Sequence, residues 1–295
     1  MQKIVPNLWY DKEAKEAAEF YVSVFGQDSK ITNVSTLHDT PSGDCDLVSF
    51  RLRGYEFMAI SAGPLFTFNP AVSFHVKCKT KDEVDPLFER LSKDGKVLMP
   101  LDAYPFSERF AWVQDRYGLS WQLIYVGDQP IRQAIMPAVM FVGDVCGKAE
   151  DAVKFWTSVF PQSKTNMMMR YPAGAKPDKE GTIQYASFAL SGQEFGAMDS
   201  AHEHKFQFNE AISFIVKCDD QAEIDRYWKA LSAVPESEQC GWLKDRFGVS
   251  WQIVPTAMDE MLRTKDEKKL DRVTQALLKM KKFDIAELEK AAEGK

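Results

Sequence analysis

The chain repeats itself, and this internal duplication constrains its fold more than any other feature. Residues 68–78 read Phe-Asn-Pro-Ala-Val-Ser-Phe-His-Val-Lys-Cys, and eight of these eleven positions are identical in residues 208–218. Residues 115–123 align in the same way with residues 245–253, with six of nine positions identical. Shorter matches pair residues 18–25 with 153–160 and residues 4–6 with 135–137, in the same order along the chain. The sequence therefore predicts two copies of one domain.

The spacing of the matches locates the differences between the copies. The offset is 131 residues at the start, 140 in the middle and 130 at the end. The second copy is thus shorter after its second helix, where the first copy has residues 93–106, and such gaps belong in surface loops. We expect one domain at residues 1–128, a second at residues 134–255, and a tail at residues 256–295.

Each copy alternates strand and helix patterns, which predicts an α+β fold. In the first copy the order is β-α-β-β-β followed by β-α-β-β, so each copy consists of two smaller βα units in series. A polar stretch at residues 39–46 predicts a loop between two strands. The strand patterns cover residues 4–10, 29–37, 47–52, 56–61, 71–78, 109–114 and 120–126, and the helix patterns cover residues 12–25 and 80–91.

Charge and composition narrow the choice of partner. The net charge is −6, and acidic and basic residues are interleaved, whereas nucleic acids and anionic membranes favour clustered positive charge. The apolar stretch at residues 131–142 is short of the roughly 20 residues that a bilayer span needs. We expect no nucleic acid and no membrane as partner, but a small molecule, bound by a monomeric pseudo-dimer or a homodimer.

The number and spacing of the cysteines indicate the redox environment of the protein. There are five, an odd number, dispersed and without a Cys-x-x-Cys pair: Cys45, Cys78, Cys146, Cys218 and Cys240. A disulfide framework or a zinc cage is not expected from this pattern. A reducing, cytoplasmic environment fits best.

The tail differs in pattern from both copies. Leu270, Val273, Leu277 and Met280 recur at helical spacing among charged residues, and a second short helix is indicated after residue 284. We interpret the tail as helices packed across the two domains. The alternative is an arm that docks a partner or dimerises.

The repeated motifs resemble those of a known group. Phe-Asn-x-Ala-x-Ser-Phe at residues 68–74 and 208–214, and the segment Cys-Gly-Trp-Leu-Lys-Asp-Arg-Phe-Gly-Val-Ser-Trp-Gln-Ile at residues 240–253, resemble PhnB-like proteins. This group is often labelled 3-demethylubiquinone-9 3-methyltransferase and belongs to the vicinal-oxygen-chelate (glyoxalase/bleomycin-resistance-like) superfamily. The resemblance implies tandem glyoxalase-like domains built from paired βαβββ modules, with curled sheets and a cavity in each. For methyl transfer itself, the sequence has no Gly-x-Gly turn after a strand to hold the cofactor.

The resemblance also implies where a divalent metal would sit, because metal-using members hold the ion with His and Glu. At the four implied ligand positions most residues are weak metal ligands or have no donor atom. The residues of the first and second copies at these positions are Pro6 or Asn7 and Pro137 or Ala138, Ser49 and Ser187, His75 and Ile215, and Gln122 and Gln252. One His and one Gln do not supply the ligand set that zinc, iron or nickel normally has. We expect no tightly held cofactor, and a loosely held divalent metal stays open.

Histidines supply the candidate base. His75 lies in a strand pattern, where it is either a partly buried structural residue or a general base in the cavity of the first copy. His202 and His204 are two residues apart, as ligands on one strand face would be, but they fall in a loop. We interpret His202 and His204 as solvated.

Further candidates come in matched positions. Gln122, Gln252, Trp112 and Trp242 are candidate pocket residues, with Ser49 and Cys240 beside them, whereas Trp121 and Trp251 face the helices. Asn69 and Asn209 either cap turns or contact a ligand. Asp115-Arg116 and Asp245-Arg246 are interpreted as turn residues with a surface ion pair. Cys240, which replaces Phe110 of the first copy, is interpreted as a small buried residue rather than a nucleophile.

Three functions are compatible with these residues. The first is a binding protein for a small aromatic or amphipathic molecule, with one working pocket, because the copies differ at His75 and Cys240. The second is an enzyme acting on a small oxygenated substrate with His75 as base, with or without a metal. The third is a structural or interaction protein that uses its tail.

Overall fold

A computed structural model describes residues 2–295. The first copy contains eight strands and two helices, and the second copy contains seven strands, two α-helices and two short 3-10 helices. The elements of the first copy are β1 (Ile4–Tyr10), α1 (Ala14–Phe25), β2 (Lys30–Thr40), β3 (Gly43–Leu52), β4 (Tyr55–Ser61), β5 (Val72–Cys78), α2 (Lys81–Ser92), β6 (Lys96–Tyr104), β7 (Ser107–Gln114) and β8 (Ser120–Tyr125). Those of the second copy are β9 (Ile135–Phe141), η1 (Gly143–Val145), α3 (Ala149–Val159), β10 (Lys164–Arg170), β11 (Ile183–Leu190), β12 (Gln193–Asp199), β13 (Ile212–Cys218), α4 (Gln221–Leu231), η2 (Pro235–Ser237), β14 (Trp242–Lys244) and β15 (Ser250–Pro255).

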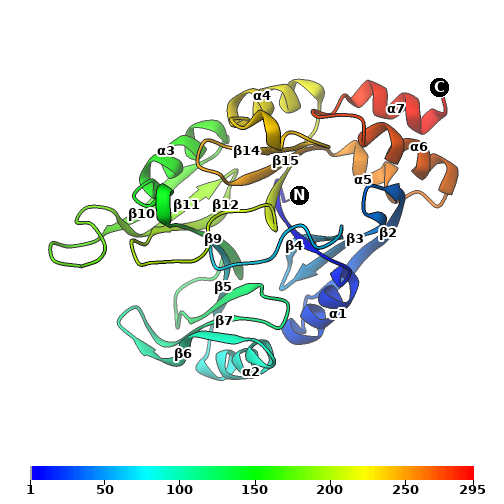
Figure 1. Cartoon of the computed structure of the whole chain (residues 1–295). Coiled ribbons are helices and arrows are strands. Elements are labelled where there is room, and N and C mark those ends of the chain that lie inside the picture. The colour runs from blue at the N-terminus through cyan, green and yellow to red at the C-terminus, as the bar shows by residue number, and fades with distance from the viewer. Residues whose placement is uncertain (1) are drawn as a thin grey trace.

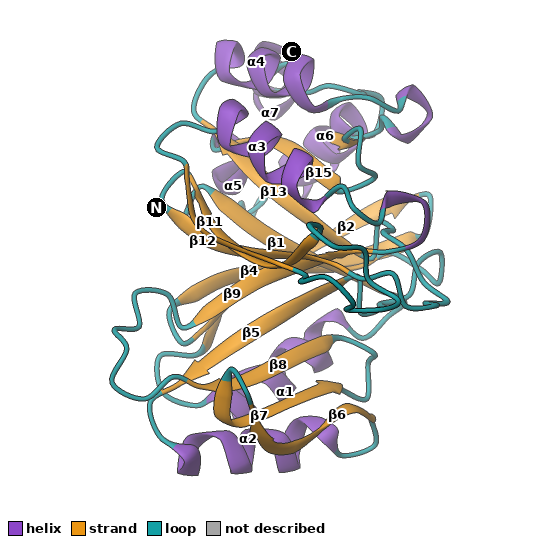
Figure 2. Ribbon diagram, turned by 90° about the vertical axis from the view of Figure 1, so that its left-hand side faces the viewer, coloured by secondary structure: helices purple, strands orange, loops and turns teal. Residues whose placement is uncertain are grey.

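The strands form two mixed sheets, and each sheet takes strands from both copies (Figures 1 and 2). The seven-stranded sheet has the order β14-β15-β13-β1-β4-β3-β2, and the eight-stranded sheet has the order β10-β11-β12-β9-β5-β8-β7-β6. The copies meet where β1 pairs antiparallel with β13 and where β5 pairs antiparallel with β9. Each sheet is therefore one βα unit of the first copy continued by one of the second.

The central strands are apolar on both faces because both faces are covered. All seven residues of β9 are buried, and β5 and β13 each expose only one lysine partly. Helices α1 and α4 pack on the seven-stranded sheet, and α2 and α3 pack on the eight-stranded sheet. The expected α+β architecture of two tandem copies is confirmed.

Two regions differ from the sequence-based expectation. The loop expected at residues 39–46 is a tight hairpin, since β2 runs to Thr40 and β3 begins at Gly43, where the Thr40 hydroxyl donates to the Gly43 carbonyl at 2.6 Å. The stretch 93–106 is not a loop but contains β6, an edge strand paired with β7. Its pairing has register shifts and most of its residues are exposed, so it lacks the regular alternation that identifies a strand in sequence.

The C-terminal tail lies where the second copy lacks a counterpart of β6. Its helices are α5 (Ala257–Met261), α6 (Glu267–Leu277) and α7 (Ile285–Glu293). Helix α5 contacts β15, α6 contacts β2, and α7 packs on α6 at the outer end (Figure 1). The amides of Cys240 and Gly241 donate to the carbonyls of Met280 and Lys281 at 2.8 and 2.7 Å. The chain after α6 thus satisfies two backbone donors beside the short β14, which an edge strand otherwise leaves open.

Gly241 shows how closely the tail is seated. Its φ is 81°, and a Cβ added there would lie 2.5 Å from the ring of Phe283, which is buried. On the other side of the tail, Leu270 of α6 packs with Leu37 and Leu47 of the first copy. The tail therefore connects the last strands of the second copy to the first strands of the first copy, as the packed-helix interpretation expects.

Two buried aspartates fix the turns before β8 and β15. Asp115 accepts hydrogen bonds from the Tyr21 hydroxyl at 2.9 Å and the Trp121 indole at 2.8 Å, and from two backbone amides of its own turn. Asp245 accepts in the same way from the indoles of Trp156 and Trp251 at 2.8 and 2.9 Å. In each copy one carboxylate thus ties a helix covering one sheet to a tryptophan of the other sheet.

The prediction of a surface ion pair at these turns is wrong. The side chains of Asp115 and Asp245 are 3% and 1% exposed, and burial raises the pKa of Asp115 to about 6. The neighbouring Arg116 and Arg246 instead stack on aromatic rings of α1 and α3, with the guanidinium of Arg116 4.0 Å from the Phe20 ring centre.

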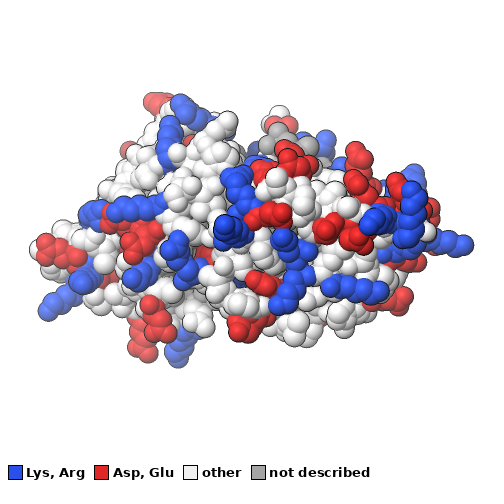
Figure 3. All heavy atoms as spheres, turned by 90° about the horizontal axis from the view of Figure 1, so that it is seen from above, with Lys and Arg blue, Asp and Glu red and all other residues white. Residues whose placement is uncertain are grey.

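The outer surface carries both signs of charge. Figure 3 shows lysine and arginine interspersed with aspartate and glutamate over the face seen from above. Within residues 2–295, no helix is long and apolar enough to cross a membrane.

We predict that Asp115→Ala lowers the free energy of unfolding by about 2–4 kcal/mol at pH 7, because it leaves the Tyr21 hydroxyl and the Trp121 indole without their acceptor inside the core. Urea unfolding followed by tryptophan fluorescence measures the change. The exposed Asp128 serves as control, and Asp128→Ala should stay within about 0.5 kcal/mol of wild type. Equal effects of the two substitutions would contradict the structural role of Asp115.

Candidate functional site

A cavity of about 840 Å³ lies over the seven-stranded sheet. Strands β1, β4 and β3 of the first copy and β13 and β15 of the second form its floor, and the tail forms one wall. The apolar lining includes Leu37, Leu47, Ile60, Phe66, Ile215, Val254, Met258 and Leu262. Its size and mostly apolar lining are typical of small-molecule sites.

Two tryptophans stand on one side of this cavity. Trp9 of β1 and Trp242 of β14 pack edge to face with ring centres 5.9 Å apart, and Phe66 packs edge to face against Trp9 at 5.1 Å. The Trp9 indole donates to the Gly63 carbonyl at 2.7 Å, which fixes its ring. Both tryptophans are partly exposed, so they offer ring surface to a bound molecule.

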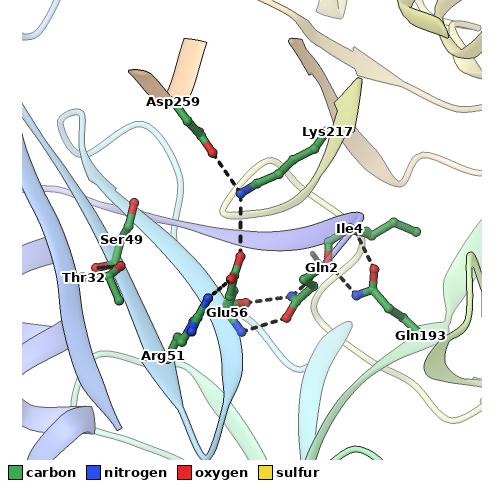
Figure 4. A network of polar contacts seen from close by, with 9 residues as sticks. All are labelled: Gln2, Ile4, Thr32, Ser49, Arg51, Glu56, Gln193, Lys217 and Asp259. Carbon is green, nitrogen blue, oxygen red and sulfur yellow. Dashed lines mark hydrogen bonds and ion pairs between the residues drawn. The ribbon is translucent and has the colours of Figure 1, made fainter. Parts of the chain in front are cut away.

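Charged residues gather at one end of the same sheet (Figure 4). Lys217 of β13 lies 3.1 Å from a carboxylate oxygen of Asp259, on α5, and 3.6 Å from one of Glu56, on β4. Glu56 also pairs with Arg51 of β3. This charged row, formed by Arg51, Glu56, Lys217 and Asp259, thus combines both copies and the tail.

Gln2 and Gln193 hold the strands beneath the charged row. The Gln2 side chain bonds both backbone groups of Glu56, at 2.8 and 3.0 Å, and Gln193 bonds both backbone groups of Ile4, at 2.7 Å each. The backbone of Glu56 is therefore fixed, and its carboxylate is placed by the sheet rather than by a loop.

Of the predicted pocket residues, four line this cavity: Ser49 and Gln252 on its floor and Trp242 and Cys240 at its tail side. The Gln252 amide donates to the Ser213 hydroxyl at 2.9 Å. Cys240 has a positive φ of 50°, and burial raises the pKa of its thiol, so the thiolate is disfavoured.

The other predicted residues lie elsewhere. Gln122, Trp112 and His75 belong to the eight-stranded sheet, where the Gln122 amide donates to Ser73 at 2.9 Å and the Trp112 indole donates to Ser120 at 2.7 Å. Asn69 and Asn209 join the copies: their side-chain amides donate to the carbonyls of Gln207 and Thr67, at 3.0 and 2.8 Å. Their oxygens also cap their own turns at Ala71 and Ala211, as the turn-capping alternative expects.

His75 is buried, with its ring stacked at 5.9 Å on that of Tyr185. Its Nε2 has no hydrogen-bond partner among the described residues. Burial, with a smaller effect from Lys77, lowers the pKa of His75 to about 3. A base with so low a pKa takes up a proton poorly at neutral pH.

The candidate ligands His202 and His204 lie in a loop. His204 shares a hydrogen bond of 2.8 Å with the Ser200 hydroxyl, whereas His202 is 63% exposed and lies 3.7 Å from Asp178. Residues 2–295 contain no group of three or more His, Cys, Asp or Glu placed to hold a metal ion. The pair therefore lacks the further ligands that a metal site needs.

Within residues 2–295, the sheet positions at which the resemblance implies a divalent metal also lack a suitable set of donors. Because the copies exchange strands, Ser49 of the first copy shares its cavity with Ile215 and Gln252 of the second. A hydroxyl, an alkyl chain and a neutral amide do not make a divalent-metal site. On the eight-stranded sheet, His75 is opposite Met136 and Gln122 in register, which leaves one imidazole.

Sequence reasoning missed the charged row. Lys77 and Lys217 are identical positions of the repeated motif, which could have marked them, but their partners Glu194 and Glu56 lie in the opposite copy. Asp259 lies in the tail, where only the apolar spacing was considered.

The comparison with known proteins decides the family. The family model described as 3-demethylubiquinone-9 3-methyltransferase matches the chain twice, over residues 2–124 and 133–254. The chain belongs to this family. Each match covers most of one copy.

Two solved structures illustrate what the chain is similar to. The PhnB protein from Bacillus cereus is 42% identical, over 42% of this chain and 100% of its own, with a TM-score of 0.40. Glyoxalase I from Zea mays is 12% identical, over 89% of this chain and 98% of its own, with a TM-score of 0.55, and this likeness shows a glyoxalase-like fold. The chain has no match among curated proteins.

We predict that His75→Ile, which installs the residue of the second copy, makes stability less dependent on pH. The unfolded chain takes up a proton on His75 below about pH 6.5, and the folded chain does so only near pH 3. Wild type therefore loses stability as the pH falls through this interval, by about 1.4 kcal/mol per pH unit from this residue.

Urea unfolding at pH 7.0, 5.5 and 4.5 tests this. The variant should match wild type within about 1 kcal/mol at pH 7 and be more stable by about 2–3 kcal/mol at pH 4.5. Parallel pH profiles of the two proteins would show that His75 also titrates in the folded state.

Proposed function

We propose that this PhnB-like protein binds a small, largely apolar molecule with a ring system in the cavity over the seven-stranded sheet. The observation that carries the proposal is the cavity itself, about 840 Å³ in volume and lined by apolar side chains with a few charged groups at one end. Trp9 and Trp242 support a ring-containing ligand, because flat aromatic surfaces favour aromatic partners.

One ligand per chain is expected, although the chain has two copies. The tail walls the cavity of the seven-stranded sheet and has no second counterpart in residues 2–295 to cover the eight-stranded sheet. We therefore expect the one working pocket on the seven-stranded sheet, which carries Ser49 and Ile215, and not on the eight-stranded sheet, which carries His75.

An enzyme with His75 as base is the weaker alternative. His75 does not line the large cavity, and its lowered pKa opposes proton uptake at neutral pH. Methyl transfer, which the family's description names, receives no support from the fold either. The sheets are mixed, unlike the doubly wound parallel sheet whose strand ends hold a cofactor.

We predict that the neutral dye N-phenyl-1-naphthylamine binds at one site per chain and that Ser49→Trp abolishes this binding. The indole at residue 49 would occupy the floor of the cavity. Titration with the dye, followed by the dye's own fluorescence, gives the affinity and the stoichiometry of binding.

The duplication supplies a matched control. Ser187 occupies the corresponding position of β11, and it has the same intermediate exposure on the eight-stranded sheet. Ser187→Trp should leave the dissociation constant of the dye within about twofold of wild type, because the eight-stranded sheet carries no part of the proposed site. Loss of binding in Ser187→Trp with binding retained in Ser49→Trp would place the ligand on the other sheet and overturn the proposal.

A further inference from the structure

The ammonium group of Lys217 is an incompletely bonded cation in the wall of the cavity. Its side chain is only 15% exposed. It donates one hydrogen bond, to Asp259 at 3.1 Å, because Glu56 at 3.6 Å is beyond hydrogen-bonding distance. An ammonium has three N–H donors, so two of them take no acceptor from residues 2–295.

The corresponding lysine of the first copy also donates one hydrogen bond, but to the glutamate of its own matched pair. Lys77 lies 2.5 Å from Glu194, and this is its one ion pair within the described chain. The two lysines and their glutamates occupy matching places on the two sheets, but only Lys217 faces a third group, Asp259 of the tail. Lys217 is thereby kept 3.6 Å from its glutamate, between two carboxylates.

The charged row is electrically balanced. Arg51 and Lys217 carry two positive charges, and Glu56 and Asp259 carry two negative charges. An anion that joined Lys217 without displacing Asp259 would lie beside two carboxylates, those of Glu56 and Asp259, and this like-charge repulsion is costly. An anion that replaced Asp259 would keep the balance.

We propose that the ligand of this cavity carries an oxyanion, such as a carboxylate or sulfonate, which binds Lys217 in place of Asp259. The inference rests on the proposed function and names the chemical class of its ligand: an apolar ring system with one acidic group. The apolar part lies toward Ile60 and Leu262, and the acidic group lies at the charged row. Because Asp259 belongs to α5, the exchange also releases a contact between the tail and the sheet.

Two dyes that differ in one group test this inference. 1-Anilinonaphthalene-8-sulfonate has the ring system of N-phenyl-1-naphthylamine and adds a sulfonate. Lys217→Met should weaken sulfonate-dye binding about tenfold or more, because it removes a charge-assisted hydrogen bond, and should change neutral-dye binding less than about twofold. Lys77→Met is the control in the other copy and should affect neither dye.

Asp259→Asn gives a second measurement with the opposite sign. Without the competing carboxylate, the sulfonate dye should bind about three- to tenfold more tightly, and the neutral dye should not respond. The neighbouring Glu260 is exposed, and Glu260→Gln is the matched control for the loss of one negative charge from α5. A structural role of Asp259 alone would not strengthen binding of one dye only.

The outcomes separate the two proposals. Neutral-dye binding with no selective response of the sulfonate dye to Lys217→Met or Asp259→Asn overturns this inference and leaves the proposed function standing. Failure of both dyes to bind overturns both. Opposite, dye-specific responses to the two variants, with Lys77→Met and Glu260→Gln silent, support it.

Discussion

Strand exchange between the copies is the constraint on which the rest of this structure depends. The antiparallel pairs β1–β13 and β5–β9 make each sheet from one βα unit of each copy. Neither copy therefore completes a sheet alone, and each surface that could bind a ligand combines residues more than a hundred positions apart. Asp115 and Asp245 hold the two units of each copy together, while the buried apolar residues of both copies form one continuous core.

The tail makes the two shared sheets different. The second copy lacks a β6 counterpart, and the chain around Met280 bonds to the backbone at Cys240 and Gly241 beside β14. The same tail buries Leu270, Val273 and Leu277, each worth about 1.5–3 kcal/mol if fully removed from water. This packing, rather than helix propensity, keeps α6 against β2 and α5 against β15, and residues of both helices line the cavity.

Much of the fold could be predicted from the sequence, because repetition and periodicity are local signals. Residues 4–10 and 71–78 were recognisable as strands, and the resemblance to the PhnB-like group supplied the architecture. Strand β6 was missed because its irregular pairing leaves no alternation. The burial of Asp115 was missed because its donors, Tyr21 and Trp121, come from other elements.

The candidate site was harder to predict for a related reason. Ser49, Gln252, Trp242 and Cys240 were named from repeat positions, and these four line one cavity. His75, Gln122 and Trp112 were grouped with Ser49 because they share its copy, but strand exchange places them on the other sheet. Position in the repeat identified the kinds of residue, whereas the pairing of the strands decided which of them meet.

The two lysines of the repeated motif show how duplication can change a residue's chemistry without changing the residue. Lys77 is held at 2.5 Å by one carboxylate, and its charge is neutralised within the sheet. Lys217 has the same sequence context, but Asp259 draws it away from Glu56 and leaves its charge shared between two longer contacts. The ammonium group of Lys217 gains more free energy from a new anionic acceptor than that of Lys77 does, because the contacts that it must break are longer and weaker. A single carboxylate in the tail thus makes a structural lysine available for recognition at the wall of the cavity.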